Sequence, residues 1–158
     1  MRRLLAMTAA TFWLAAMSSP AAACMLPQTY FFTHGSAAID QRSEDALRVV
    51  VSWLHRNADG LKEIRVTGHS DRTGSRAGRR AISLARAKAV RDRLVSYGIP
   101  SGLMVIEAMG DAKPAVATGE GVPEPDNRRA DIRIILTEAG LAALQARPAT
   151  PIGSIPTC

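Results

Sequence analysis

The stretch "GHSDRTGS", residues 68–75, places Asp71 between two glycines, directly after the alternating run "EIRV". This arrangement is typical of a loop that follows a β-strand. Fifteen residues after Asp71 comes Arg86, which lies on the same four-residue spacing as Ile82, Val90 and Leu94. That spacing predicts a helix whose apolar face carries the arginine. A carboxylate in a glycine turn and a guanidinium near the core are therefore the first candidates for chemistry.

Two interpretations of Asp71 and Arg86 are open from the residue pattern. A guanidinium near a core is costly unless it is paired, and Asp71 is the acid best placed by sequence to reach it. The pair is then a buried salt bridge that pins a loop to a helix. Alternatively, the two side chains present opposite charges to a zwitterion. In that case Asp71 takes an ammonium group, and Arg86 takes a carboxylate through its two-pronged guanidinium.

Other chemistries fit the sequence less well. His69, Ser70 and Asp71 include the residue types of a serine hydrolase, but adjacent residues in an extended turn cannot relay a proton, and no G-x-S-x-G elbow is present. His34, His69 and Asp71 have no spacing typical of metal ligands. The run "GSRAGRR" lacks the lysine and hydroxyl pair of a phosphate-binding loop. The sequence therefore predicts no enzymatic activity, no metal site and no cofactor.

Hydrophobic periodicity and helix breakers predict the elements that must position these residues. In chain order they are a strand at 29–32, a helix from 43 to about 60, a strand at 63–66, a helix at 78–97, strands at 103–109 and 127–136, and a short helix at 138–146. The order β-α-β-α-β-β predicts an α/β sandwich (α+β) with two helices packed on one face of a mixed sheet. The loop after the second strand, the start of the second long helix and the start of the fourth strand are expected to converge on one edge.

The two ends of the chain have the composition of processing and tail segments. Residues 1–23 combine a basic start, an apolar run and the small residues "SSPAAA", as a signal peptide does. The apolar run is short against the roughly 20 residues of a membrane-spanning helix, so a retained anchor is the weaker alternative. The expected organisation is then a short segment at 24–28, a domain at 29–137, and a short helix with a proline-broken tail at 138–158.

The two cysteines lie at the ends of the expected mature chain, at Cys24 and Cys158. In an oxidising compartment they can form a disulfide that joins the termini. The alternative is a lipoprotein in which Cys24 carries the lipid. The run "AAAC" has the small residues of a lipidation motif but lacks the usual leucine three positions before the cysteine. Both possibilities stay open.

The net charge is +6, and much of the excess lies in one segment. Residues 72–93 hold eight basic side chains against the single acid Asp92. Such a patch attracts acidic polymers. Export and an aromatic content of only 4% argue against nucleic acid as the partner. Anionic lipids and cell-wall carboxylates are the expected partners of an envelope protein with this charge.

The runs "VTGHSDRTGS", "AISLARAKAVRDRLVSYGIP", "MGDAKP" and "NRRADIRI" resemble the OmpA-like peptidoglycan-binding domain over roughly residues 29–137. This domain also occurs in peptidoglycan-associated lipoproteins and flagellar motor stators. The resemblance implies a protein of the periplasm, or of the periplasmic face of the outer membrane, that binds the diaminopimelate residue of the peptidoglycan stem peptide. It assigns that binding to Asp71 and Arg86. It also places Arg128 in the same pocket with Asn127 beside it, and makes Thr73 a contact from the turn.

The sequence departs from the family pattern at two places near the expected pocket. Arg79 stands where the family usually has an asparagine, and Thr33–Gly35 replaces a run of acidic, aromatic and acidic residues. The alternative function is that of an envelope structural or interaction protein that contacts anionic lipid or an acidic protein partner through its basic helix face, without wall binding. The sequence does not predict the oligomeric state or the protein partners.

Overall fold

A computed structural model describes residues 28–146. Its elements are β1 (Gln28–Phe31), α1 (Gln41–Arg56), β2 (Leu61–His69), α2 (Arg76–Ser96), β3 (Met104–Gly110), β4 (Arg129–Leu136) and α3 (Glu138–Gln145), with 3₁₀ turns η1 (Ala58–Gly60), η2 (Ser101–Leu103) and η3 (Pro125–Asn127). The predicted β-α-β-α-β-β order and the short terminal helix are confirmed. The expected signal peptide, Cys24 and Cys158 lie outside the described residues.

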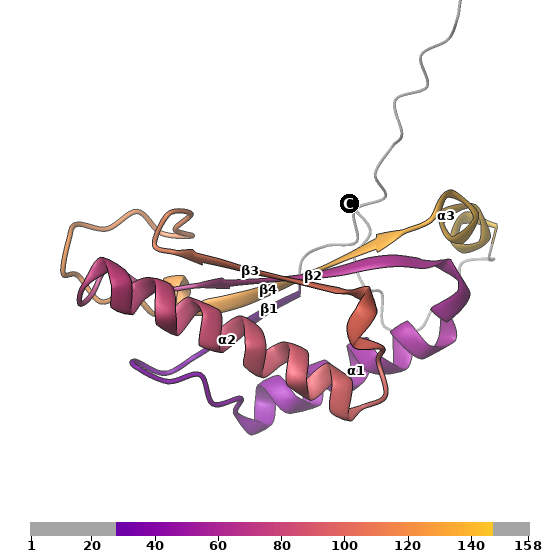
Figure 1. Cartoon of the computed structure of the whole chain (residues 1–158), viewed down its shortest axis with the longest axis horizontal. Helices are drawn as coiled ribbons and strands as arrows, with labels where there is room; N and C mark the ends of the chain where they lie inside the picture. The colour runs from indigo at the N-terminus through magenta and orange to yellow at the C-terminus, as the bar shows by residue number, and fades with distance from the viewer. Residues whose placement is uncertain (1–27, 147–158) are drawn as a thin grey trace, which may run out of the picture.

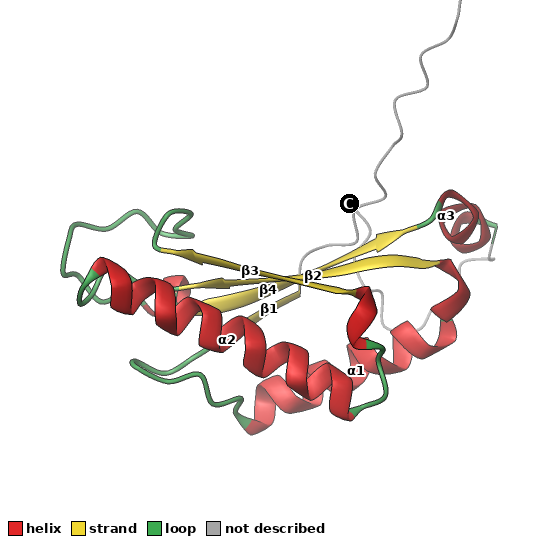
Figure 2. Cartoon of the chain, viewed as in Figure 1, coloured by secondary structure: helices red, strands yellow, loops and turns green. Residues whose placement is uncertain are grey.

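The four strands form one mixed sheet in the order β1-β4-β2-β3. β2 and β3 are parallel and are joined through α2, whereas β4 is antiparallel to both β1 and β2. Figure 1 and Figure 2 show α1 and α2 on one face of this sheet, and α3 beyond the end of the sheet where β4 finishes. The predicted α+β sandwich with two helices on one face is therefore confirmed.

The core lies between the sheet and these two helices. Ala130, Ile132 and Ile134 of β4 alternate toward it and are almost completely buried, as their spacing of two predicts. They meet Leu54 of α1 and Leu94 of α2, both fully buried. Burial of such side chains contributes on the order of 1.5–3 kcal/mol each. The sheet and α2 therefore form a rigid support for the loops at their ends.

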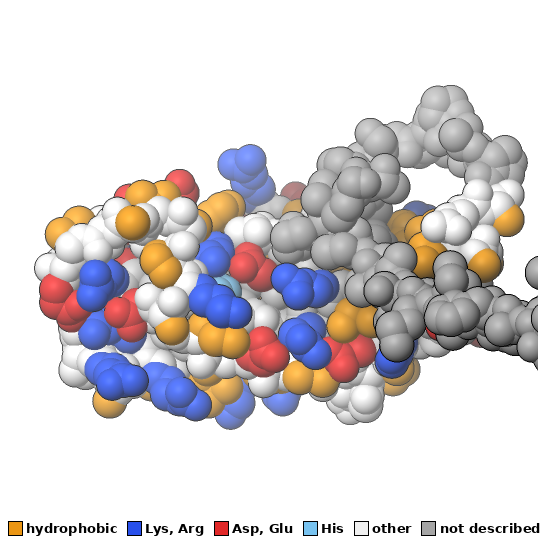
Figure 3. Space-filling view, turned by 90° about the horizontal axis from the view of Figure 1, so that it is seen from above, with side chains coloured by type: hydrophobic (Ala, Val, Ile, Leu, Met, Phe, Trp, Pro, Cys, Tyr) orange, Lys and Arg blue, Asp and Glu red, His pale blue; other side chains and the backbone are white. Residues whose placement is uncertain are grey.

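The opposite face of the sheet carries charged side chains instead. Figure 3, which views this side, shows basic and acidic groups lying beside one another. Arg65 of β2, for example, pairs with Glu63 at 2.7 Å and lies 3.6 Å from Glu107 of β3. Such pairs on a solvated face contribute little to stability.

The start of α2 is set by a cap and by a close contact with β2. Ser75 caps the helix by accepting a hydrogen bond from the backbone N–H of Gly78, so α2 begins two residues earlier than expected. Near the end of β2, a Cβ atom added to Gly68 would lie 1.8 Å from the carbonyl oxygen of Ser83. Only glycine permits this approach, which brings the Arg86 turn of α2 beneath the end of β2.

Within the described residues, no helix is both long and apolar enough to cross a bilayer.

Candidate ligand-binding site

The loops that follow β1, β2 and β3 gather at one end of the molecule, on the left in Figure 2. This end holds Asp71 in the turn after β2, Arg86 on α2, and Arg128 just before β4. The expected convergence on one edge of the sheet is thus confirmed.

Asp71 is 4% exposed, and both of its oxygens have partners. Oδ1 accepts a hydrogen bond from the Thr73 hydroxyl at 2.6 Å, and Oδ2 accepts one from Nη1 of Arg128 at 3.3 Å. Nδ1 of His34 lies 3.7 Å from the same Oδ2. Burial acts to raise the pKa of Asp71, but the hydrogen bonds from Thr73 and Arg128 outweigh it and hold that pKa below its ordinary value. The carboxyl is therefore ionised at neutral pH.

Arg86 is 1% exposed and is held mainly by backbone carbonyls. Its Nε donates to the Ser36 oxygen at 3.0 Å, Nη1 to the His69 oxygen at 2.8 Å, and Nη2 to the Thr33 oxygen at 3.3 Å. Its guanidinium also lies over the ring of Phe32, 5.4 Å from the centroid. Burial lowers the pKa of Arg86 to about 10, which still leaves the side chain charged at neutral pH.

Asp71 and Arg86 are not joined directly. Among residues 28–146, no carboxylate lies within 4.0 Å of the Arg86 guanidinium, so the interpretation of a direct salt bridge between the two is wrong. The reason is that α2 aims Arg86 at three carbonyl oxygens, while Arg128 reaches Asp71 from the other side. A guanidinium carries five N–H groups. Three of these donate to carbonyl oxygens, which leaves two N–H groups without a hydrogen-bond acceptor among the described residues.

Arg128 and Asn127 are neighbours in sequence but face different partners. Nε of Arg128 donates to the Phe32 oxygen at 3.2 Å, and this directs the guanidinium toward Asp71. Asn127 is fully buried and turns its amide to the loop before it. Its Oδ1 accepts from the backbone N–H groups of Ala115 and Val116, and its Nδ2 donates to the Val116 oxygen. Asn127 therefore holds the loop, and its contact with a ligand stays a prediction.

Arg79 is buried, with 8% exposure, although it belongs to the basic segment of residues 72–93. It lies on the same side of α2 as Ser83, Arg86 and Val90, which are also buried, and the loop 111–124 supplies acids to it. Its Nη1 donates to the carbonyl oxygens of Arg72 and Gly74 and to Glu120, and its Nε lies 3.2 Å from Asp111. Sequence reasoning missed Asp111 and Glu120. The available signal was the seven-residue, two-turn spacing of Arg79 and Arg86.

His69 is buried, with 3% exposure, and its carbonyl is one of the three that hold Arg86. Its Nε2 lies 3.3 Å from Asp131 of β4. Burial acts to raise the pKa of Asp131, but hydrogen bonds from His69 and Thr29 outweigh it and lower that pKa. In the part of the chain that the structure describes, no three His, Cys, Asp or Glu side chains are grouped as metal ligands.

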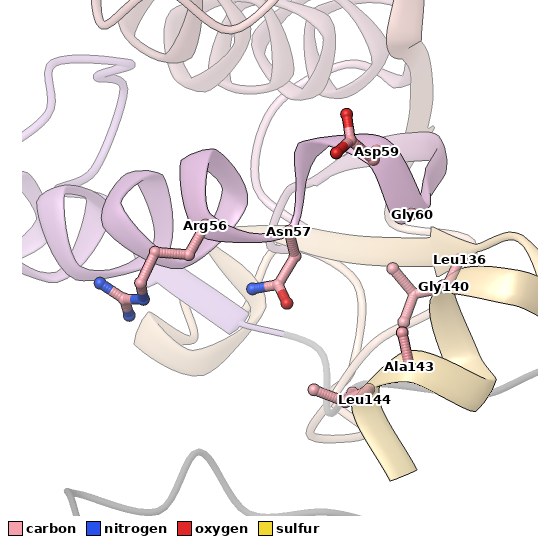
Figure 4. A pocket seen from close by; sticks show the side chains of 8 residues that line it. All are labelled: Arg56, Asn57, Asp59, Gly60, Leu136, Gly140, Ala143 and Leu144. Atoms are coloured by element: carbon pink, nitrogen blue, oxygen red, sulfur yellow. The ribbon is translucent and has the colours of Figure 1, made fainter. Parts of the chain in front are cut away.

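A separate hollow of about 190 Å³ lies at the other end of the molecule. Figure 4 shows it between the end of α1 with η1 and the helix α3, lined in part by Leu136, Ala143 and Leu144. It contains none of the predicted site residues and brings no group of ionisable side chains together around a common point. The Asp71 end of the sheet is the candidate site because it brings together Asp71, Arg86 and Arg128.

Comparison with known proteins agrees with the fold described above. The family model described as the OmpA family matches residues 31–128. A peptidoglycan-associated lipoprotein of Agrobacterium fabrum is 33% identical over 100 residues, which cover 63% of this chain and 55% of that protein. The crystal structure of the peptidoglycan-associated lipoprotein from Burkholderia pseudomallei superposes with a TM-score of 0.60 at 23% identity, covering 69% of this chain and 89% of that one.

A third similar structure is the cell wall anchor of the T6SS from Pseudomonas aeruginosa, with a TM-score of 0.54 and 27% identity over 67% of this chain and 75% of that one. Relatives known from sequence are longer. The chain spans 20% of an outer membrane protein of Gluconacetobacter diazotrophicus, at 35% identity over 44% of this chain, and about half of the A. fabrum lipoprotein. The resemblance found in the sequence motifs is confirmed.

Proposed function

Because the chain belongs to the OmpA family, we propose that it binds peptidoglycan non-covalently in the cell envelope, through the diaminopimelate residue of the stem peptide. The names of its relatives, peptidoglycan-associated lipoprotein and outer membrane protein, support this function and an envelope or periplasmic location. The observation that carries the proposal is the separation of charge at the site. Asp71 and Arg86 are both buried and charged, yet neither neutralises the other directly.

Each charge suits one half of a zwitterionic ligand. The two remaining N–H groups of Arg86 suit a carboxylate, which accepts paired hydrogen bonds from a guanidinium. An ammonium group suits Oδ2 of Asp71, where the present contacts are 3.3 Å and 3.7 Å long. The longer contact comes from His34, whose side chain is 67% exposed and can turn away. The α-carbon of an amino acid carries both charged groups within reach of such a site.

Charge-assisted hydrogen bonds to a single zwitterionic centre give modest affinity for one stem peptide. The cell wall repeats that centre many times, so anchoring or oligomerisation would strengthen attachment through effective concentration. Binding of this kind needs no catalytic group.

The test is binding of the purified protein to isolated diaminopimelate-type sacculi and to a soluble stem peptide. Asp71→Asn removes the charge at nearly constant shape. Glu44→Gln is the matched control, because Glu44 is also a buried carboxylate with arginine partners but belongs to α1 at the other end of α2. We expect wild type and Glu44→Gln to bind and Asp71→Asn to lose binding at least about tenfold. Circular dichroism checks the fold of each variant, and a folded Asp71→Asn protein that binds like wild type contradicts the proposal.

The second candidate is contact with anionic lipid, or with an acidic protein partner, through the exposed face of α2. Arg76, Arg80 and Lys88 are exposed there and form no ion pair within the described residues. Attraction of this kind is non-specific and falls with salt. Sedimentation with anionic vesicles separates the two functions, because vesicle binding would survive in Asp71→Asn.

A further inference from the structure

Four charged side chains beside the site form one network, which we name the rim network: Arg72, Arg79, Asp111 and Glu120. They come from the turn after β2, the first turn of α2, and the loop 111–124 that follows β3. We propose that the rim network is a positioning device for the wall-binding site, which holds the Asp71 turn against the loop leading to Arg128. The inference rests on the proposed function and concerns what sets the affinity of that site.

Arg79 is the centre of the rim network. Its Nη1 donates to the carbonyl oxygens of Arg72 at 3.1 Å and Gly74 at 3.2 Å, so it fastens the turn that contains Asp71 and Thr73. The same nitrogen donates to Glu120, and Nε lies 3.2 Å from Asp111. The hydrogen bond with Glu120 raises the pKa of Arg79, and the same bond lowers the pKa of Glu120. One guanidinium thus connects the turn to both acids of the neighbouring loop.

Arg72 makes a second set of connections between the same two segments. Its Nη1 donates to the Thr118 oxygen at 2.9 Å, and its Nη2 lies 3.0 Å from Glu120. Its own carbonyl oxygen accepts from the backbone N–H of Gly121 at 2.9 Å. The turn and the loop are therefore joined by backbone as well as side-chain contacts.

The loop passes this restraint to the other side of the site. Asn127 holds the loop at Ala115 and Val116 from its far end, and Arg128 follows directly. Asp71 and Arg128, which contact each other at 3.3 Å, are thus carried by two segments that the rim network ties together. Within the described residues, no member of the rim network forms an ion pair with Asp71 or Arg86. Its effect on a ligand must therefore pass through the position of the turn.

This arrangement depends on the arginine at position 79. An asparagine, which the family resemblance leads one to expect there, is too short to reach carbonyls of the turn and acids of the loop at once, and has no charge to pair with them. The acids Asp111 and Glu120 both lie within ion-pair distance of the Arg79 guanidinium. The chain therefore replaces a small neutral group with a charged connection at the rim of the site.

The experiment compares the affinity of three variants for a soluble stem peptide that ends in diaminopimelate. Glu120→Gln and Arg79→Gln each remove one charge of the rim network. Asp126→Asn is the matched control, because it removes the same negative charge near the end of the same loop without breaking an ion pair of the described residues. We expect Glu120→Gln and Arg79→Gln to weaken binding about threefold to tenfold, and Asp126→Asn to leave it unchanged.

Two further readouts separate positioning from a general effect on stability or charge. The double variant Arg79→Gln/Glu120→Gln is expected to lose less affinity than the sum of the two single losses, because the Arg79–Glu120 contact is removed in both single variants. In Glu120→Gln, amide hydrogen exchange is expected to rise at Thr73, Gly74 and Gly121, while the thermal unfolding midpoint stays the same.

The outcomes distinguish this inference from the function beneath it. If wild type binds the stem peptide and Glu120→Gln binds as tightly, the positioning role is wrong and the proposed function stands. Equal losses in Glu120→Gln and Asp126→Asn also overturn it, because they indicate a general charge effect. If wild type itself does not bind the stem peptide, the proposed function is wrong, and the positioning role that rests on it is wrong as well.

Discussion

Two buried carboxylates at opposite ends of α2 are built from similar parts and differ in how their charges are paired. Glu44 accepts a hydrogen bond from the Tyr97 hydroxyl, and Nε of Arg93 lies 3.1 Å from its other oxygen. Arg48 approaches to 3.8 Å and lies over the Tyr97 ring. The side chains of both arginines are largely exposed, at 62% and 45%. Acid and base here satisfy each other and fasten α1 to α2.

At the Asp71 end, the buried cation Arg86 is held by backbone carbonyl oxygens rather than by a carboxylate. Arg86 spends three N–H groups on backbone carbonyls, and Asp71 turns to Thr73 and Arg128. A charge held by neutral groups keeps its field, whereas a charge paired with its opposite loses most of it. Arg86 is the charge without an opposite partner, since Asp71 is itself paired with Arg128 at 3.3 Å. The comparison leads us to expect a structural role for the Glu44 cluster and a ligand-binding role for the end that holds Arg86.

The two ends of α2 also meet the sheet differently, and the largest expected effect tests this difference. Near Glu44 the contact is made by side chains such as Leu94, whereas Gly68 meets the backbone of Ser83 directly. Gly68→Ala places a Cβ atom 1.8 Å from a carbonyl oxygen that cannot easily move. We expect the free energy of unfolding to fall by at least about 3 kcal/mol, measured by urea denaturation.

Gly102→Ala is the control for this change, since nothing lies within 4 Å of a Cβ atom at that glycine. Its stability is expected to change by less than about 0.5 kcal/mol. An unchanged urea midpoint in Gly68→Ala would contradict the close contact on which the position of Arg86 depends.

The arginines of the two clusters are the next test. Arg86→Ala leaves three carbonyl oxygens without their donor and empties a fully buried volume, so we expect a loss of about 2–4 kcal/mol. Arg93→Ala removes a partly exposed partner of Glu44 and is expected to cost less than about 1 kcal/mol. Thermal unfolding of both variants measures the difference. Equal losses of stability would mean that the three hydrogen bonds from Arg86 to carbonyl oxygens stabilise the fold no more than the partly exposed Arg93–Glu44 ion pair does.

The elements that support both clusters follow from local pattern. The alternation of Ala130, Ile132 and Ile134 and the four-residue spacing that carries Arg86 are local features, because burial on one face imposes a period on each element. The family motifs predict that Asp71, Arg86 and Arg128 belong to one site, and the structure brings these three residues to one end of the sheet.

What could not be predicted depends on the loop 111–124. Its path decides that Arg79 is buried rather than solvated, and that Asp111 and Glu120 are its partners. An irregular loop has no period, so its contacts are set by tertiary packing alone. The choice of Arg128 over Arg86 as the partner of Asp71 has the same origin, since it depends on which carbonyl oxygens the loop after β1 presents to Arg86.

The low pKa of Asp71 predicts how the separated charges respond to acid. A carboxyl whose folded pKa is depressed keeps its charge above that value, and loses it as the pH falls through it. Stem-peptide binding is therefore expected to persist at pH 5 and to disappear only at lower pH. In Thr73→Val the 2.6 Å hydrogen bond is absent, the pKa of Asp71 rises, and the acid limb of the binding curve moves to higher pH.

Titration of binding between about pH 3 and pH 6 measures this shift for wild type and Thr73→Val. Thr29→Val is the control, because Thr29 donates to Asp131 rather than to Asp71. Identical acid limbs in all three proteins would show that the Thr73 hydroxyl does not hold the charge of Asp71 in place.

The smallest effect is expected at His34, the exposed side chain 3.7 Å from Oδ2 of Asp71. This side chain is 67% exposed and can turn away, so it contributes little to holding the carboxylate in place. We expect His34→Gln to change the affinity for the soluble stem peptide by less than about twofold, measured beside Asp71→Asn at one pH. A loss in His34→Gln as large as the loss in Asp71→Asn would show that His34 itself contacts the ligand.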